Sequence, residues 1–245
     1  MPNPPLADTI VLHPETLTRL SQASTATITT LLYKRGYHNA FVQGVAPLGY
    51  GKRPLIGPAY TLRYSPARPD TDPIEAFREP DHPQRLAVEE CPAGAVLVMD
   101  CRQDASAASA GSILLTRLQV RGAAGVVTDG GIRDAAGAAA LDMPVFAAKP
   151  SAPTNLTKHH AVDIGLPIAC GGVAVYPGDI ALGDGVMVIP RHLADAVAEE
   201  CVGTELFEAF VLEEVRRGVP IRGLYSPTDP ETLVRFETWR NRKKG

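Results

Sequence analysis

The stretch GSILLTRLQVRGAAGVVTDGGIRD, residues 111–134, contains both ends of a predicted ligand site. It predicts a helix that begins after Gly111, a buried strand over 125–128, and a glycine turn that ends in Arg133-Asp134. In a strand–helix–strand unit, the start of the helix and the end of the next strand lie at the same edge of the sheet. Open α/β sheets usually bind ligands at that edge.

Short apolar runs on both sides of this stretch predict a parallel sheet. Residues 95–99 and 143–147 are buried-strand candidates, and 135–142 is a short helix candidate. The order strand, helix, strand, helix, strand over 95–147 makes two linked crossover units, which require a parallel layer. From 162 to 189 the pattern changes to strands and glycine turns without helices, which predicts an antiparallel or mixed second β-layer.

The ends of the chain are predicted to be helical or loose. Residues 1–14 predict a loose arm, and 15–35 predict one or two helices, because apolar residues recur at helical spacing. Two interpretations are open for the hydroxyl-rich residues 24–30: a capped helix N-terminus, or a set of ligand-facing hydroxyls. Residues 193–217 predict a C-terminal helix.

Other segments are predicted to be strands and surface loops. Residues 40–45 and 56–64 predict short strands, and the proline-rich residues 65–83 predict a surface excursion. His82 lies in that excursion without a partner at ligand spacing, so we expect a solvated loop histidine. The basic tail RNRKKG, residues 240–245, is predicted to be a flexible, solvated end.

Composition favours one domain and excludes several classes of partner. A chain of 245 residues with 45% hydrophobic content can bury one core, which we assign to 15–217, with an arm over 1–14 and an extension over 218–245. The balance of 24 basic and 27 acidic residues argues against a nucleic-acid or membrane partner.

We expect a cytoplasmic protein. The four cysteines are widely spaced and form no Cys-x-x-Cys pair, which argues against a zinc site or a disulfide framework. The N-terminus lacks the basic and then apolar run of a signal peptide. No apolar stretch reaches the roughly 18 residues of a membrane helix.

Arg133 and Asp134 together indicate anion and metal binding. An arginine can bind a carboxylate through two parallel hydrogen bonds, and an aspartate can hold a hard divalent cation whose other ligands are waters and substrate oxygens. The alternatives are that Asp134 caps the following helix and that Arg133 pairs with a surface acid.

The other end of the stretch indicates oxygen binding by backbone amides. Gly111 permits close approach, and the N–H groups of Ser112, Ile113 and Leu114 at a helix start suit a carboxylate or enolate oxygen. The alternative is that Gly111 simply makes a turn. Both ends together predict a site for a small 2-oxo acid and a divalent metal.

Three segments taken together resemble the RraA-like family. They are residues 111–134, VLVMDCRQDASAASA at 96–110, and LPIACGGVAVYPGDIALGDGVMVIP at 166–190. The family contains metal-dependent 4-hydroxy-4-methyl-2-oxoglutarate / 4-carboxy-4-hydroxy-2-oxoadipate aldolases and the regulator of ribonuclease activity A. The resemblance covers 23–200 and implies an α/β, swivelling β/β/α three-layer domain with N- and C-terminal helices. It also implies a homo-oligomer, a trimer or a dimer of trimers, with active sites between subunits.

The resemblance implies roles for the residues of the stretch. Arg133 would bind the substrate carboxylate, Asp134 would bind Mg²⁺ or Mn²⁺, and the amides after Gly111 would hold the oxygen that becomes an enolate. A metal chelated by a 2-oxo acid withdraws electrons from C2 and stabilises the enolate left when the C3–C4 bond breaks. Decarboxylation of an oxaloacetate-type acid and dehydration of a 3-deoxy-2-oxo acid use the same electron sink.

The sequence departs from the aldolases at the proton-transfer position. Their acidic residue is replaced by Ser112, whose hydroxyl cannot accept a proton at neutral pH as a carboxylate can. Either Asp104 substitutes for it, or the reaction needs no strong base there. Asp104 as a simple turn residue is an equally open interpretation.

Four further residues are candidates on weaker grounds. Glu213 or Glu214 of a neighbouring subunit's C-terminal helix is a candidate metal ligand. His159 and His160 are adjacent on a predicted strand and so point to opposite faces, which prevents joint chelation of one ion. One of the two histidines remains a candidate general acid or base. The segment GDGVMVIP is shorter than the family's usual form, which removes the expected contacts of Asp184.

The sequence therefore predicts a metal-dependent lyase of the class II aldolase type. Its substrate would be a small 4-hydroxy-2-oxo acid and its product pyruvate. Decarboxylation and dehydration are the alternatives within the same site. The alternative from another class is a non-catalytic regulator that binds ribonuclease E.

Overall fold

The centre of the molecule is a parallel layer of four strands. The structure is a computed structural model that describes residues 12–49 and 53–244. The four strands are β2 (Leu55–Pro66), β3 (Val96–Asp100), β5 (Gly125–Ile132) and β6 (Val145–Pro150). β3 runs parallel to β2 and to β5, and β5 runs parallel to β6. The predicted parallel layer is confirmed.

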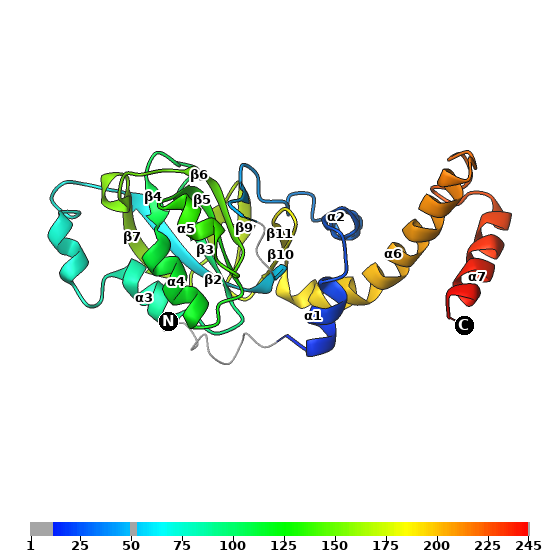
Figure 1. The fold of residues 1–245 in the computed structure, drawn as a ribbon, viewed down its shortest axis with the longest axis horizontal. Coiled ribbons are helices and arrows are strands. Elements are labelled where there is room, and N and C mark those ends of the chain that lie inside the picture. Colours follow the sequence, from blue (N-terminus) through cyan, green and yellow to red (C-terminus); the bar gives the residue numbers. More distant parts are fainter. Residues whose placement is uncertain (1–11, 50–52, 245) are drawn as a thin grey trace.

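Short helices connect the parallel strands. These helices are α3 (Pro83–Glu90) before β3, α4 (Ser112–Val120) between β3 and β5, and α5 (Ala135–Ala139) between β5 and β6. Figure 1 shows all three on one face of the sheet. Every residue of β3 and of β5 is buried, because the sheet is covered on both faces.

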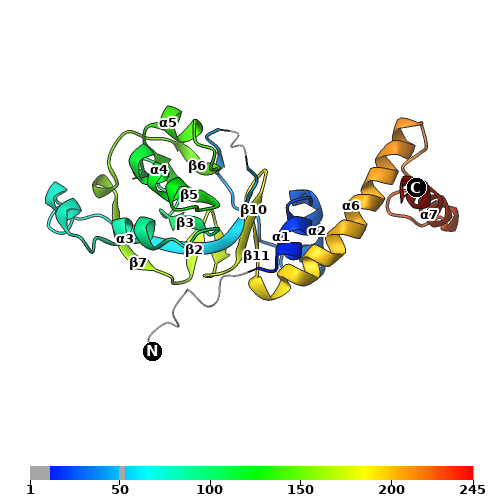
Figure 2. The same ribbon diagram turned by 60° about the horizontal axis from the view of Figure 1, so that its bottom comes forward.

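Most of the other strands are antiparallel. The long strand β2 pairs with β7 (His159–Ile164) at one end and with β10 (Ile180–Gly183) at the other. β1 (Ala46–Pro47) on β6 and β11 (Met187–Ile189) on β10 are also antiparallel, whereas β4 (Ala108–Ala110) runs parallel to β5. The antiparallel hairpin of β8 (Ile168–Cys170) and β9 (Val173–Val175) is a separate two-stranded sheet. The result is a curled, mixed sheet, which confirms both the α/β class and the predicted antiparallel half (Figure 2).

Helices from both ends of the chain pack together beside the sheet. They are α1 (Pro14–Leu20), α2 (Thr25–Lys34) and α6 (Ala194–Arg216), which share a buried apolar cluster with β10 and β11. Ser24 caps α2, because its Oγ accepts a hydrogen bond of 3.0 Å from the amide of Thr27. The capping interpretation of residues 24–30 is thereby confirmed, and most of the predicted arm, residues 1–11, lies outside the described residues.

The prediction of a strand over residues 40–45 is wrong. Only a single bridge, between Phe41 and Met187, forms there. The next amides bond to separate segments: Val42 donates to the carbonyl of Val186 (2.8 Å) and Gln43 to the carbonyl of Gly171 (3.1 Å). A strand needs consecutive bonds to one partner, so no ladder can form.

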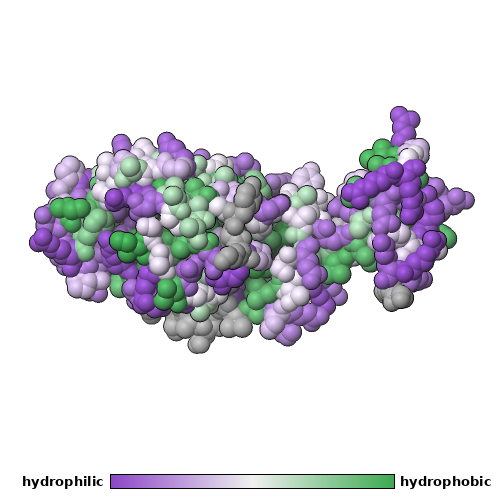
Figure 3. Space-filling view, in the orientation of Figure 1, coloured by the Kyte–Doolittle hydropathy of each residue, from purple (hydrophilic) through white to green (hydrophobic). Residues whose placement is uncertain are grey.

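The prediction of a flexible basic tail is also wrong. The last described residues form α7 (Pro230–Lys244), which packs against the end of α6. Phe236 and Trp239 contact Phe210 of α6, and Trp239 Nε1 donates a hydrogen bond of 2.8 Å to Glu213. The exposed surface of this helix pair is mostly hydrophilic, and the pair projects from the body of the molecule (Figures 1 and 3). Even α6, with 23 residues, is not apolar enough to cross a membrane, and neither is any other helix in the described part of the chain.

Candidate active site

The turn after β5 fixes the backbone of Arg133 and Asp134 and exposes both side chains. The amide of Arg133 donates a hydrogen bond of 2.9 Å to the carbonyl of Ala110. Asp134 has a φ of 55°, in the left-handed region that aspartate tolerates better than most residues. The turn therefore carries an exposed guanidinium and an exposed carboxylate on adjacent residues.

The carboxylate of Asp134 joins the two ends of residues 111–134. Its Oδ2 accepts a hydrogen bond from Ser112 Oγ at 3.1 Å and a longer one from the Ser112 amide at 3.4 Å. α5 begins immediately after Asp134, but none of its amides donates a hydrogen bond to the Asp134 side chain. The interpretation of Asp134 as a helix cap is therefore wrong, whereas the expected meeting of the two ends at one sheet edge is observed.

Gly111 provides space at this junction. A Cβ at Gly111 would lie 3.2 Å from Asp134 Oδ2 and 3.4 Å from Arg133 Cβ. Its φ of −133° is open to any residue, so the turn alone does not require glycine. The amides of Ile113 and Leu114 belong to the first turn of α4, where N–H groups have no acceptor within the helix.

A pocket of about 180 Å³ lies at this edge of the sheet. Five predicted site residues line it: Gly111, Ile113, Leu114, Arg133 and Asp134. Ser112 does not line the pocket, but its hydroxyl donates a hydrogen bond to the Asp134 carboxylate. The volume is below the roughly 300 Å³ at which pockets for drug-sized ligands begin, so it suits a short-chain acid.

The far wall of the pocket comes from residues that the sequence did not indicate. They include Phe77 of the 3₁₀-helix η2 (Ile74–Arg78), Gln84 and Arg85 of α3, and Thr154 and Asn155, which are next to β7 in the chain. One sequence signal was available, because proline is favoured in the first helical turn and Pro83 therefore marks the start of a helix. Nothing in the sequence indicated that this helix faces the end of β5.

The prediction of a solvated His82 is wrong. Its side chain is 9% exposed, and its ring lies 5.4 Å from that of Phe77. Burial, followed by the nearby charge of Arg85, lowers the pKa of His82. A neutral ring therefore packs behind the far wall of the pocket.

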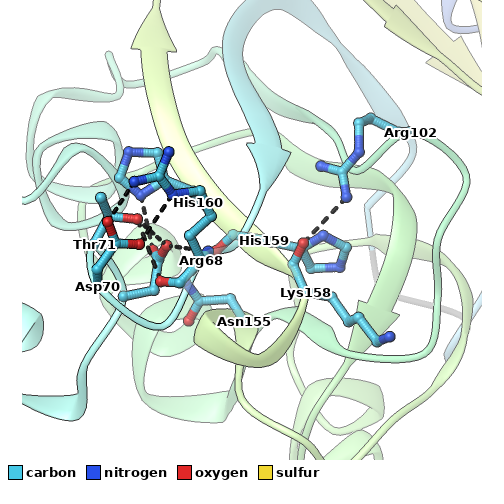
Figure 4. A network of polar contacts seen from close by, with 9 residues as sticks. Arg68, Asp70, Thr71, Arg102, Asn155, Lys158, His159 and His160 are labelled. Atoms are coloured by element: carbon cyan, nitrogen blue, oxygen red, sulfur yellow. Dashed lines mark hydrogen bonds and ion pairs between the residues drawn. The ribbon is translucent and has the colours of Figure 1, made fainter.

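His159 and His160 diverge from β7, as their adjacent positions predict (Figure 4). His159 is fully buried, 5.6 Å from the ring of Tyr64, and burial lowers its pKa. His160 Nδ1 lies 2.8 Å from a carboxylate oxygen of Asp72. Neither histidine lines the pocket.

Asp104 lies in the loop after β3 and does not line the pocket. Its carboxylate accepts hydrogen bonds from the hydroxyl and the amide of Ser106, and these bonds lower its pKa. The carboxylate is therefore ionised at neutral pH, as a base must be. Its role as the base nevertheless stays a prediction.

The other candidate acids are engaged elsewhere. Asp184 accepts a hydrogen bond of 2.9 Å from Thr25 Oγ1. Glu213 bonds to Trp239, and Glu214 pairs with Arg235 at 2.8 Å, so both glutamates fasten α7 to α6 within one chain.

A second aspartate, within β5, has a structural role. Asp129 is 3% exposed and accepts hydrogen bonds from the amides of Cys101 (2.6 Å), Gln103 (3.1 Å) and Gly171 (3.1 Å). Burial raises its pKa. This carboxylate ties the loop after β3 to the turn between β8 and β9.

The pocket residues fit a cation held by a single carboxylate. Asp134 is the one acid among the described residues that line the pocket, and the described chain has no cluster of three or more His, Cys, Asp or Glu side chains suited to a metal ion. Mg²⁺ often binds through one or two carboxylates and keeps waters that substrate oxygens replace. Asp134 Oδ1 accepts no hydrogen bond from the described residues and is free for this purpose.

Comparisons with known proteins agree on one family. A family model described as RraA-like, aldolase/RraA, matches residues 25–188. A protein of Halalkalibacterium halodurans, provisionally named 4-hydroxy-4-methyl-2-oxoglutarate aldolase, is 37% identical over 116 residues, which are 46% of this chain and 55% of that protein. The chain spans about half the length of the curated relatives it matches.

Solved structures share the fold. RraAS2 of Streptomyces coelicolor, described as an unusual member of the RNase ES inhibitor RraA protein family, has a TM-score of 0.71 at 28% identity, over 81% of this chain and 96% of that one. An uncharacterised protein of Pseudomonas syringae has a TM-score of 0.73 at 21% identity, over 86% and 96% of the two chains. The RraA-like fold is therefore confirmed.

Proposed function

We propose that this chain, which belongs to the RraA-like family, is a divalent-metal-dependent lyase that cleaves a small 4-hydroxy-2-oxo acid and releases pyruvate. The pocket at the start of α4 supports the proposal, as does the name of the Halalkalibacterium relative. That relative matches over only part of its length, so its activity is not transferred by similarity alone.

The observation that carries the proposal is the state of Arg133 beside Asp134. The guanidinium of Arg133 lines the pocket and forms no hydrogen bond or ion pair with any described residue. An unpaired guanidinium that lines a small pocket suits the C1 carboxylate of a 2-oxo acid, which it can bind through two parallel hydrogen bonds.

The start of α4 serves the other oxygens of the substrate. Breaking the C3–C4 bond leaves negative charge on the oxygen at C2. Ile113 and Leu114 line the pocket in the first turn of α4, and we propose that their amides and the positive end of the helix dipole face this charge. They stabilise the charged state without any rearrangement of the protein.

Asp134 would hold the cation, and Ser112 positions Asp134. A divalent cation at this carboxylate would withdraw electrons from the C2 carbonyl of the bound acid. The hydroxyl of Ser112 donates to Oδ2 and so leaves Oδ1 available. This arrangement fixes the direction of the carboxylate.

The proton steps need a group that the pocket of one chain lacks. Aldol cleavage requires a base for the C4 hydroxyl, and Asp134 is the one acid among the described lining residues. We propose Asp104, or an acid from another subunit, for this role. Decarboxylation of an oxaloacetate-type acid needs no such base, so it is the second candidate, and dehydration of a 3-deoxy-2-oxo acid is the third.

We propose a homo-oligomer, a trimer or a dimer of trimers, built from a domain over residues 15–217 with a C-terminal extension over 218–245. The family resemblance supports this assembly. Light scattering coupled to size-exclusion chromatography tests it, and a monomeric mass would contradict an active site shared between subunits.

A regulator of ribonuclease E is the candidate from another class. It is supported by the similarity to RraAS2, whose description names an RNase ES inhibitor family. In that case the pocket would have no catalytic role, and the protein would not turn over 2-oxo acids.

A coupled assay of pyruvate release separates these candidates. Oxaloacetate and a set of 4-hydroxy-2-oxo acids are supplied with Mg²⁺ or Mn²⁺, and with EDTA as the control. We expect turnover that EDTA abolishes and that added metal restores. Absence of metal-dependent turnover on every acid would remove the enzyme proposal.

Ser112→Asp tests the missing base. If a carboxylate at this position limits aldol cleavage, the variant cleaves 4-hydroxy-2-oxo acids faster while its rate on oxaloacetate changes little. Equal changes of rate on both substrate classes would show that another group accepts the proton of the C4 hydroxyl.

A further inference from the structure

The C-terminal hairpin, residues 213–245 with the end of α6 and with α7, carries a positive charge that the rest of the chain does not share. It contains eight lysines and arginines against five aspartates and glutamates, whereas residues 1–212 contain 16 against 22. The overall charge balance therefore hides a positive end on a negative body. Figures 1 and 2 both show this hairpin projecting from the body of the molecule. A positive patch on a projecting element favours the approach of anions.

A small pocket lies between the two helices of the hairpin. It has a volume of about 180 Å³, and Phe210 and Trp239 form part of its wall. Three arginines also line it: Arg217 at the end of α6, and Arg235 and Arg242 of α7. Arg235 and Arg242 are seven residues apart, which is close to two helical turns, so they lie on the same face of α7. The pocket thus brings together arginines from both helices.

A buried carboxylate fixes two of these arginines. Glu214 is 7% exposed, and its two oxygens lie 2.9 Å from Arg217 Nη1 and 2.8 Å from Arg235 Nη1. A guanidinium has five N–H donors, of which the bond to Glu214 uses one. Glu214 therefore holds both groups in place and leaves donors on each of them for a ligand.

The third arginine, Arg242, lacks a partner within the described chain. It lines the pocket but forms no hydrogen bond or ion pair with any described residue. The neighbouring acid of α6, Glu213, is already matched by Lys243 at 3.0 Å. Three guanidiniums therefore share the single carboxylate of Glu214, and the pocket has an excess of two positive charges. An anion between them would relieve the repulsion of like charges.

We infer that the pocket between α6 and α7 binds the phosphate group of a small phosphate monoester. Such a group carries a charge of about −1.5 to −2 at pH 7, which matches the excess of the pocket. Its oxygens also accept the paired hydrogen bonds that a guanidinium offers. The inference is independent of the proposed lyase activity, because this pocket shares no residue with the pocket at the start of α4.

The single tryptophan of the chain reports on this pocket directly. Trp239 lines the pocket, and the sequence contains one tryptophan. The tryptophan fluorescence of the full chain is therefore titrated with methyl phosphate and with dimethyl phosphate at pH 7.5, with the ionic strength kept constant by NaCl. The two probes differ by one methyl group and one negative charge, so they separate a monoester from the diester of a nucleic-acid backbone.

Arg242→Gln and its matched control Arg222→Gln separate the pocket from general charge. Both remove one exposed positive charge from the hairpin, but Arg222 does not line the pocket. We expect Arg242→Gln to bind methyl phosphate about tenfold more weakly than the wild type, the range for a hydrogen bond between charged groups. Arg222→Gln should bind as the wild type does, and the wild type should prefer methyl phosphate over dimethyl phosphate by a similar factor. Unchanged melting temperatures exclude misfolding of the variants.

Three results would overturn the inference, and none of them bears on the proposed lyase activity. A fluorescence change that does not saturate with methyl phosphate, or that NaCl alone reproduces, would show that the pocket holds no phosphate. Equal weakening by Arg222→Gln and Arg242→Gln would show that binding follows the general charge of the hairpin. Tighter binding of dimethyl phosphate, or of a 12-nucleotide oligouridylate without a terminal phosphate, would assign the hairpin to a nucleic-acid backbone instead.

Discussion

Asp129 lies within β5 and Asp134 follows the end of that strand, yet the two aspartates have opposite surroundings. Asp129 is buried, and three backbone amides from two distant segments donate to its carboxylate. Asp134 is exposed, and a single residue, Ser112, donates to one of its oxygens. Both oxygens of the Asp129 carboxylate accept hydrogen bonds, whereas Oδ1 of Asp134 accepts none from the described residues.

The difference shows how a structural acid is told from a functional one. Buried polar groups in folded proteins are almost always hydrogen-bonded, so a carboxylate with several backbone donors is explained by the fold. A carboxylate that is fixed in direction but only partly bonded is not explained in this way. On this ground Asp134, rather than Asp129, is the acid that we propose binds a ligand.

Asp134→Asn gives the largest expected effect on activity. Loss of the charge that would hold the cation should lower kcat/KM by about a hundredfold to a thousandfold, the range for one lost electrostatic contact to the transition state. The melting temperature should be unchanged, because asparagine tolerates the same left-handed turn. A large fall in melting temperature with activity retained would place Asp134 in the same structural class as Asp129.

Asp129→Asn should show the reverse pattern. An amide cannot accept from all three N–H donors, and each buried donor left unpaired costs about 1–3 kcal/mol. We expect the free energy of unfolding to fall by about 2–3 kcal/mol, seen as a melting temperature lower by about 5–10 °C. At 20 °C the kcat of the folded fraction should be near that of the wild type. The exposed Asp81→Asn is the matched control and should change neither quantity.

The pH dependence of stability sharpens the contrast. Burial raises the pKa of Asp129 above the ordinary aspartate value, so the folded state binds more protons than the unfolded state in the window between the two values. The contribution of Asp129 to stability therefore falls as the pH rises through that window. The asparagine of Asp129→Asn does not titrate. The difference in unfolding free energy between the wild type and this variant should therefore shrink as the pH rises from about 4. Urea unfolding of both proteins from pH 4 to pH 7 measures this, and a deficit that grows with pH would contradict the direction.

Gly111→Ala tests the space beside Asp134. The new Cβ would press on Oδ2 at 3.2 Å and displace the carboxylate by a few tenths of an ångström. We expect about a tenfold loss of kcat/KM, because small misplacements of binding groups are costly in catalysis. Gly203→Ala in α6 is the control, since nothing lies within 4 Å of its Cβ position. Equal activity of the two variants would show that the junction is not tight.

Ser112→Ala gives the smallest expected effect. It removes one hydrogen bond to Asp134, while the amide of the same residue still donates. A fall in kcat/KM of about threefold to tenfold is expected for the loss of one such bond. Metal affinity, measured by calorimetry, should fall by a similar factor. A loss as large as that of Asp134→Asn would mean that the hydroxyl itself takes part in the reaction.

The sequence predicted those parts of the molecule that depend on local pattern. Apolar runs and glycine turns indicated the strands around residues 95–147, and crossover geometry brought Gly111 and Asp134 to one edge. These features need only the order of elements along the chain. The roles assigned to the residues at that edge are not yet tested.

The remaining features depend on contacts between distant segments. Arg85 lines the pocket because α3 is fastened to β4 and α4, and no pattern within residues 65–90 encodes that. The many charged residues of α7 favoured the prediction of a solvated tail, although two aromatic residues of this helix pack on Phe210. The same limit explains His82, whose burial results from packing against Phe77.

The left-handed turn at Asp134 also bears on how such a site is gained or lost in evolution. Asparagine adopts the same conformation, and the codons of aspartate and asparagine differ by one base. A single point mutation can therefore remove the negative charge without disturbing the turn, and its reversal can restore the charge. If Asp134 holds the cation as we propose, a lineage with this turn can pass between an enzyme and a binding protein while its core stays the same.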